Sequence, residues 1–147
     1  MSAKVVFILL TSAIKPRIVC DLAEKLYLDG RRLIIYSGNE DETKRLDQLL
    51  WTWKQQSFIP HQYVGVLSEA LPEPVILTNK MVKENDYNTI ILVDPLPPEK
   101  LKSFDIIIDF AEKYDMSALS ASRERFKVYR THRFEIDSLP PGEFLHT

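Results

Sequence analysis

The sequence has few cysteines, histidines and glycines, and each shortage excludes a class of site. A single cysteine, Cys20, allows neither an intramolecular disulfide nor a thiolate metal cluster. The three histidines are too scattered to suggest a zinc site, so we expect no metal. The four glycines form neither GxGxxG nor GxxxxGK[ST]. A loop that cradles nucleotide phosphates is therefore not expected, nor is any cofactor.

Long hydrophobic runs and a strong charge excess are also missing. The first apolar run, Val5 to Leu10, is too short to span a membrane, and no cleavage site of a signal peptide follows it. We therefore expect a cytoplasmic protein with no membrane partner. The formal net charge of -2 argues against a protein that binds nucleic acid with its whole surface, although it leaves room for local basic patches.

Apolar strands alternate with amphipathic helices along the 147 residues. The patterns predict strands at 4–10, 33–36, 75–78, 89–93 and 104–110, helices at 14–28, 41–53 and 117–130, and a short helix starting at 97–98. They predict an irregular stretch over 54–71 and a tail over 137–147. This alternation predicts one α/β domain over residues 1–147: a three-layer α/β/α sandwich around a mostly parallel sheet, Rossmann-like but without a phosphate-binding glycine loop.

No residue pattern supports catalysis, so we predict no catalytic site. Cys20 falls beside the apolar face of the first predicted helix, where packing explains it better than a reactive thiol does. His61 follows a proline in the irregular stretch, and no nucleophile in an elbow context accompanies it. Asp94, Asp105 and Asp109 lie at or near strand ends, where turn formation and solvation explain them.

The second predicted helix carries both tryptophans, and they differ in orientation. Four residues recur at helical spacing and predict a core stripe: Leu46, Leu49, Leu50 and Trp53. At about 100° per residue, Trp51 projects roughly 140° away from Leu46. A tryptophan off the stripe needs a second apolar surface to cover it. Either the segment 57–60 of the same chain or a partner protein supplies that surface, and periodicity does not decide between them.

The last predicted helix carries a local basic excess. Arg123, Lys127 and Arg130 share one face, with Leu119 and Phe126 beside them. Residues 123–133 hold five basic side chains against one acidic side chain, a local excess of +4. This pattern fits a solvated helix face, a dock for an acidic peptide with a hydrophobic end, or a contact to phosphate.

Three segments carry a family resemblance. The segment RLDQLLWTWKQQSFIPH (45–61) has a helix ending in Leu-Asp-x-x-Leu-Trp, then Ser-Phe-[Ile/Val]-Pro-His. The segment SRERFKVYR (122–130) fits Arg-Glu-Arg-[Tyr/Phe]-Lys-x-Tyr-Arg, and DFAEKYD (109–115) precedes it. Their order and spacing agree from end to end. In these motifs the chain resembles the chi-subunit family of bacterial DNA polymerase III.

The resemblance implies a non-catalytic accessory subunit of DNA replication. In that family, chi pairs with the psi subunit, which links it to the clamp loader. It also binds the acidic, Phe-terminated tail of single-stranded-DNA-binding protein (SSB). The resemblance implies a psi-binding surface made by Trp51, Phe58, Ile59 and Pro60. It implies a tail-binding site made by Arg123, Phe126, Lys127, Arg130 and Ala111.

The sequence departs from the family pattern at two places. The segment 79–88 is mixed in charge where the family can be basic, so we expect DNA contact to be mainly indirect, at replication forks of the nucleoid. Phe126 stands where tyrosine also occurs, which removes a hydroxyl. Two alternatives stay open: a nucleotide- or nucleic-acid-binding α/β domain, and a module that binds a repair helicase through the Trp51 surface.

Overall fold

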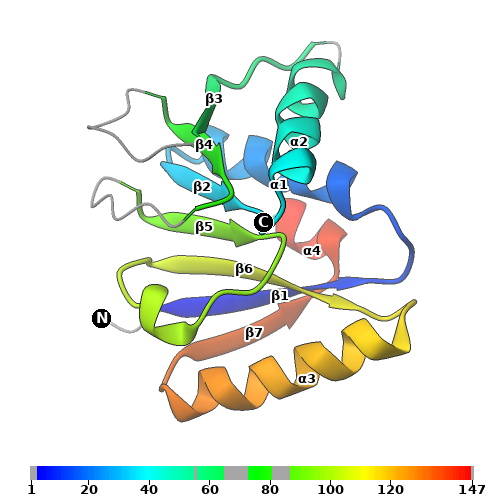
Figure 1. The fold of residues 1–147 in the computed structure, drawn as a ribbon, viewed down its shortest axis with the longest axis vertical. Coiled ribbons are helices and arrows are strands. Elements are labelled where there is room, and N and C mark those ends of the chain that lie inside the picture. Colours follow the sequence, from blue (N-terminus) through cyan, green and yellow to red (C-terminus); the bar gives the residue numbers. More distant parts are fainter. Residues whose placement is uncertain (1–2, 55, 65–72, 81–86, 147) are drawn as a thin grey trace.

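The computed structural model describes residues 3–54, 56–64, 73–80 and 87–146 and contains a seven-stranded sheet. The strands lie in the order β3-β4-β2-β5-β6-β1-β7, and every pairing between them is parallel (Figure 1). Their bounds are β1 Lys4–Leu10, β2 Leu33–Tyr36, β3 His61–Val64, β4 Val75–Thr78, β5 Thr89–Leu92, β6 Ile106–Glu112 and β7 Glu135–Leu139. The sequence predicts a mostly parallel sheet, and the described sheet is parallel throughout.

Local sequence signals set the limits of the helices. Their bounds are α1 Lys15–Leu28, α2 Glu40–Thr52, the 3-10 helix η1 Pro98–Lys100, α3 Met116–Thr131 and α4 Pro141–Leu145. Gly30 has a φ of 83° just past α1, a backbone conformation that glycine adopts without strain. Asn39 and Asp115 cap α2 and α3 by accepting hydrogen bonds from the backbone N–H groups of Glu42 and Ala118.

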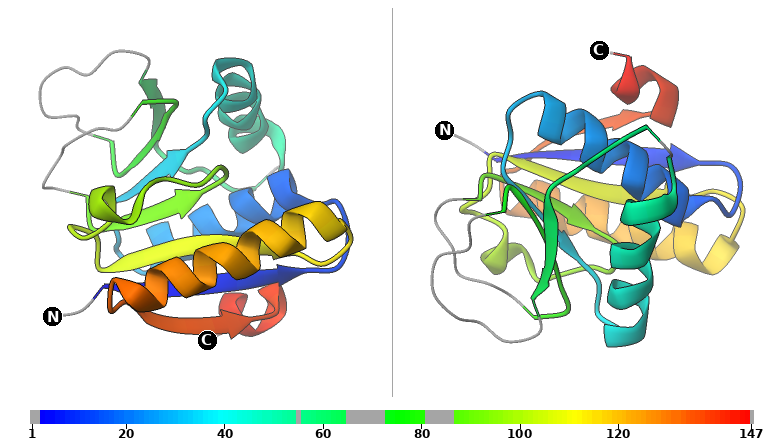
Figure 2. Two further views of the ribbon diagram at one scale, coloured as in Figure 1. Left: turned by 60° about the horizontal axis from the view of Figure 1, so that its bottom comes forward. Right: turned by 90° about the horizontal axis from the view of Figure 1, so that it is seen from above.

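Two hydrophobic cores lie on opposite faces of the sheet. Alternate residues of β1 point to opposite sides, so Val6 and Ile8 join the core under α1 and α2, whereas Val5 and Phe7 join the core under α3. Figure 2 shows α1 and α4 on one face of the sheet and α3 on the other. The three-layer α/β/α prediction is therefore confirmed.

Three short elements occupy regions where the sequence predicts no strand or helix. Strand β3 lies within the stretch 54–71, of which residues 55 and 65–71 lie outside the described residues. Strand β7 and helix α4 occupy most of the expected tail. Strand β7 pairs with β1 at one edge of the sheet, and its sequence EIDSL is largely polar because most of its side chains remain exposed. An edge strand of this kind lacks the apolar run that marks the central strands.

The strand order separates the two regions that the sequence singles out. Strands β3 and β7 form opposite edges of the sheet. Helix α2 packs near β3 and β4, and α3 packs on β6 and β7 (Figure 1). No helix within the described part of the chain is long and apolar enough to cross a membrane.

Candidate partner-binding sites

Trp51 and Phe58 form an exposed aromatic pair, called here the aromatic surface. Trp51 is 49% exposed and Phe58 is 70% exposed. Their ring centroids lie 5.9 Å apart. Leu46 and Leu50 are buried on the other side of α2, as the predicted core stripe requires. The segment after α2 therefore covers Trp51 only in part, and a large apolar area remains open to solvent.

The segment 57–61 alternates between inward and outward side chains. Ser57 donates a hydrogen bond to the carboxylate of Glu24 on α1, and Lys54 pairs with the same carboxylate at 2.9 Å. Burial acts to raise the pKa of Glu24, but the hydrogen bond from Ser57 and the pairing with Lys54 outweigh it and lower that pKa. Phe58, the residue after Ser57, points outward into solvent.

Two residues expected in the psi-binding surface differ in exposure from the aromatic pair. Ile59 is 1% exposed and belongs to the core under α1 and α2, so its side chain cannot contact a partner in this conformation. This corrects the expectation, because in an extended segment the residue after an outward-facing side chain points inward. Pro60 is half-buried. His61 is not in a loop: it begins β3, and it is buried.

A pocket of about 490 Å³ lies between α3 and the sheet, called here the α3 pocket. Its apolar part is lined by Phe7, Leu9, Ala111, Leu119 and Phe126. Its basic part is lined by Lys113, Arg123, Lys127 and Arg130. All five residues of the expected tail-binding site thus line one pocket. Such a pocket can take an aromatic or aliphatic side chain next to a carboxylate.

Sequence reasoning missed several residues of the α3 pocket. Lys113 follows β6 and adds a fourth cation, while Phe7, Leu9 and Ser138 come from β1 and β7. The register of the sheet pairs Leu9 with Ala111. The alternation of inward and outward residues along β1 puts Phe7 and Leu9 on one face, but only the strand order reveals that this face lies under α3.

Arg125 does not belong to the basic face of α3. Its guanidinium binds both oxygens of Asp109, with Nε 2.9 Å from Oδ2 and Nη2 3.0 Å from Oδ1. Tyr129 donates a further hydrogen bond to Asp109 Oδ2 at 2.7 Å. Burial acts to lower the pKa of Arg125, but its hydrogen bonds and ion pair with Asp109 outweigh it and raise that pKa. Burial and the charge of Asp109 also raise the pKa of Tyr129.

Asp109 therefore has a structural role that the sequence analysis did not assign. It is 2% exposed in the middle of β6, not solvated at a strand end. A carboxylate buried in an apolar layer requires partners that compensate its charge, and Arg125 and Tyr129 provide them. The spacing of Arg125 and Tyr129, four residues apart on one helical face, is the sequence signal that fits this pairing.

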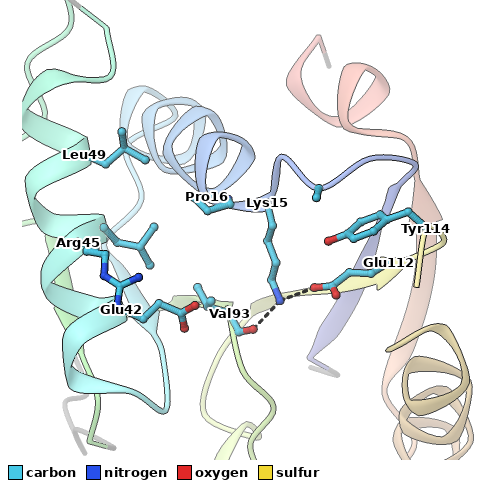
Figure 3. Close-up of a pocket in the computed structure, with 10 residues that line it drawn as sticks. Lys15, Pro16, Glu42, Arg45, Leu49, Val93, Glu112 and Tyr114 are labelled. Atoms are coloured by element: carbon cyan, nitrogen blue, oxygen red, sulfur yellow. Dashed lines mark hydrogen bonds and ion pairs between the residues drawn. The ribbon is translucent and has the colours of Figure 1, made fainter. Parts of the chain in front are cut away.

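A second cavity, of about 540 Å³, lies at the carboxyl ends of β1, β5 and β6 (Figure 3). Open α/β sheets hold nucleotides at such an edge. Here the amino group of Lys15 is held by the carboxylate of Glu112 at 2.7 Å and by the carbonyl oxygen of Val93 at 2.6 Å. Glu42 also lines the cavity, and burial with the charges of Glu112 and Asp115 raises the pKa of Tyr114. Two carboxylates, of Glu42 and Glu112, and two cations, Lys15 and Arg45, line the cavity, so its lining has no net positive charge to attract phosphates.

Two further candidate groups, Cys20 and Asp94, have structural roles. Cys20 is fully buried in the core, as predicted. Asp94 accepts hydrogen bonds from the Gly38 backbone N–H at 2.7 Å and from the Ser37 hydroxyl at 3.3 Å, which ties two strand ends together. Within the described ranges, no group of three or more His, Cys, Asp or Glu side chains could hold a metal ion.

Comparisons with known proteins agree with the sequence motifs. A family model described as DNA polymerase III chi subunit, HolC, matches residues 1–137. The Escherichia coli K12 protein named DNA polymerase III subunit chi is 25% identical over 122 residues, which cover 83% of this chain and 82% of that protein. The Haemophilus influenzae protein of the same name is 28% identical over 123 residues, covering 82% and 83%. In Pseudomonas aeruginosa, the like-named protein is 24% identical over 120 residues, covering 82% of each chain.

One solved structure has a similar fold. The crystal structure of T4 UvsW superposes with a TM-score of 0.65 over 95% of this chain. The match spans 42% of the UvsW chain, and the sequence identity is 9%. This likeness concerns the α/β fold alone.

Proposed function

Because the chain belongs to the DNA polymerase III chi subunit family, and so to the accessory subunits of DNA replication, we propose that it links the clamp loader to SSB-coated single-stranded DNA. It does so as one domain over residues 1–147, with no catalysis of its own. The psi subunit binds the aromatic surface, and the SSB tail binds the α3 pocket. The observation that carries this proposal is the α3 pocket, where apolar walls adjoin four basic side chains on a protein whose net charge is -2.

The chemistry of the α3 pocket fits a short acidic tail that ends in phenylalanine. A terminal phenyl ring can enter between Phe126 and Ala111, which are half-buried and buried respectively. Its carboxylate then lies within reach of Arg123, and preceding acidic residues face Lys127 and Arg130. The Arg130 guanidinium lies 6.0 Å from the centre of the Phe126 ring. The lack of a hydroxyl at Phe126 leaves recognition to the ring contact and the cations.

The aromatic surface fits a protein partner rather than a charged ligand. Exposed tryptophan and phenylalanine side chains anchor protein interfaces because each buries a large area at a small cost in side-chain entropy. Trp51, Phe58 and the half-buried Pro60 make up this proposed psi contact, without Ile59. A repair helicase that used the same surface would compete with psi.

A peptide-binding assay tests the tail site. A labelled acidic peptide ending in Ile-Pro-Phe should bind with an affinity that falls as salt rises, as measured by fluorescence anisotropy. Arg123→Ala should weaken binding by about tenfold or more, because a charge-assisted hydrogen bond contributes about 1.5–3 kcal/mol. Arg17→Ala removes the same charge from an exposed position on α1 and should leave binding unchanged.

The opposite outcome would replace the proposal. If the wild-type chain ignored the peptide at low salt but bound nucleotide or naked single-stranded DNA, it would be a nucleotide- or nucleic-acid-binding domain instead. For the aromatic surface, Trp51→Ala should weaken psi binding by about tenfold or more, a size typical of an interface anchor, whereas Leu28→Ala, at an exposed leucine on α1, should leave it unchanged. If both variants lost psi binding to the same extent, the aromatic surface would not be part of the interface.

A further inference from the structure

His61 lies beneath the aromatic surface, and the proposed partner contacts do not explain it. Its side chain is 0% exposed, so no partner can touch it. It nevertheless closes the Ser-Phe-Ile-Pro-His segment, in which Ser57 anchors the chain to α1 and Phe58 faces solvent. His61 can therefore affect partner binding only through a neighbouring residue.

Both ring nitrogens of His61 face backbone oxygens from opposite sides. Nδ1 lies 2.6 Å from the carbonyl oxygen of Ile59, and Nε2 lies 3.1 Å from the carbonyl oxygen of Asp47. The Asp47 carboxylate is 3.4 Å from Nε2. Burial raises the pKa of that carboxyl, and His61 acts against the shift. A neutral imidazole donates its single N–H to one of these carbonyl oxygens, and a protonated imidazole donates to both, so at least one hydrogen bond holds the ring in place.

The fixed imidazole is in contact with Trp51. The centroids of the indole and the imidazole lie 4.3 Å apart with the planes tilted by 43°. Asp47 precedes Trp51 by one helical turn on α2, so His61 binds the backbone of the same helix that carries the tryptophan. Phe58 contacts the indole as well, at 5.9 Å. Trp51 is thus in contact with two rings from one segment while about half of it stays exposed.

We propose that His61 is a positioning residue of the aromatic surface, which holds the Trp51 indole in the orientation that the partner protein meets. This rests on the proposed function, in which the partner is psi. A side chain that is already ordered loses less rotamer freedom on binding, so a fixed indole gives a tighter complex. Histidine suits this role because it combines a flat ring with a nitrogen at each edge. Phenylalanine has the ring without the nitrogens, and glutamine lacks the ring.

The free chain provides the first test. With 5-fluorotryptophan incorporated, ¹⁹F NMR gives one resonance for Trp51 and one for Trp53, whose indole N–H donates to Asp21 at 3.0 Å. In His61→Ala the Trp51 resonance should shift and broaden while the Trp53 resonance stays in place. If neither resonance moved, or both did, His61 would not act on Trp51 specifically. If His61→Ala fails to fold, His61→Phe decides: an unmoved Trp51 resonance there overturns the proposal.

Binding to purified psi provides the second test. His61→Ala should weaken psi binding by about three- to tenfold, a size expected for the loss of one ordered aromatic anchor. It should leave the SSB-tail peptide affinity unchanged, as should His146→Ala, a matched substitution at an exposed histidine after α4. In a Trp51→Ala background, His61→Ala should add no further loss, because the residue that it positions is gone.

Two outcomes separate the failure of this inference from the failure of the proposed function. If the wild-type chain does not bind psi but the Trp51 resonance responds to His61→Ala, the partner is wrong and the positioning role stands. If psi binds the wild type and His61→Ala equally well, His61 does not position the anchor. The same conclusion follows if His61→Ala weakens psi binding by its full factor in the Trp51→Ala background as well.

Discussion

At the α3 pocket, one buried carboxylate determines which arginine is available to a ligand. Asp109 binds Arg125 through both oxygens, and it accepts the Tyr129 hydroxyl and the Phe110 backbone N–H. Arg125 is therefore not available, whereas Arg123 is exposed. The two arginines lie two residues apart, about 200° around the helix, so the same ion pair that holds Arg125 inward keeps Arg123 outward.

Loss of the Asp109 charge should destabilise the fold. In Asp109→Asn, Arg125 keeps its charge in a largely buried site but loses a bidentate partner, and the amide nitrogen faces an N–H of Arg125, which cannot accept a hydrogen bond. Breaking a buried pair in this way costs about 3–5 kcal/mol, which urea unfolding would measure. Asp105→Asn, at an exposed aspartate just before β6, should change the unfolding free energy by less than about 0.5 kcal/mol. Similar values for the two variants would mean that the pair does not stabilise α3 on the sheet.

Cys20 should make the protein less stable at alkaline pH. Burial, with the nearby charge of Asp21, raises the pKa of the thiol from its ordinary value of 9.0 to about 12. The folded protein holds this proton more tightly than the unfolded chain does. The stabilisation is therefore complete below the unfolded pKa and is lost as the pH rises from about 9 toward 12.

A comparison of unfolding curves isolates this effect. Between pH 8 and pH 10 the wild type should lose more unfolding free energy than Cys20→Ala, and the wild-type thiol should react with a disulfide reagent only on unfolding. Parallel curves would show that Cys20 does not contribute to the pH dependence.

At the scale of elements, the strands and helices that carry a clear hydrophobic pattern were predictable from the sequence. The apolar runs of β1 and β6 and the helical stripe of α2 identified the central strands and the orientation of Trp51. The sequence also predicts the four-residue strands β2 and β4, which are largely apolar. It does not predict β3, which is equally short but begins with a histidine whose burial depends on α2. Strand β7 is polar for a different reason: as an edge strand it needs few apolar side chains.

In the candidate sites, too, the sequence predicts the features that a local pattern marks and misses those that depend on tertiary contacts. The basic face of α3 follows from helical spacing, and the structure brings Arg123, Lys127 and Arg130 to one pocket with Ala111. The spacing of Arg125 and Tyr129 places them on one helical face but does not identify Asp109 as their partner. The contribution of Lys113 depends on how α3 packs on β6, which no local pattern reports. Ile59 was placed at the surface by its position in a motif, although the alternation of the segment turns it inward.

The attachment of the segment after α2 to α1 should support psi binding. Glu24→Gln keeps an acceptor for Ser57 but removes the ion pair with Lys54. Because Lys54 is exposed, the unfolding free energy should fall by less than about 1 kcal/mol. The affinity for psi should fall by about two- to threefold, since Phe58 is held less firmly. Isothermal titration calorimetry would measure this, with Glu143→Gln on α4 as the control. A decrease no larger than that of the control would exclude the anchor from the interface.

At the scale of the whole molecule, the sheet separates the two proposed sites. Seven parallel strands spaced about 4.8 Å apart place β3 and β7 roughly 29 Å from each other. Helix α2 covers one face near β3 and α3 covers the opposite face near β7 (Figure 2). The two sites share no residue, and the charges of the α3 pocket are screened over about 8 Å at physiological salt. A linker that binds two partners at once requires such a separation.

Binding at the two sites should therefore be independent. The affinity of the SSB-tail peptide for the free chain and for the chain saturated with psi should agree within about twofold, because no shared contact or two-state element couples the sites. Fluorescence anisotropy with and without psi would measure both affinities, and Arg123→Ala should weaken them by the same factor. A change of tenfold or more on adding psi would mean that psi itself reaches the tail or that the sheet transmits a conformational change.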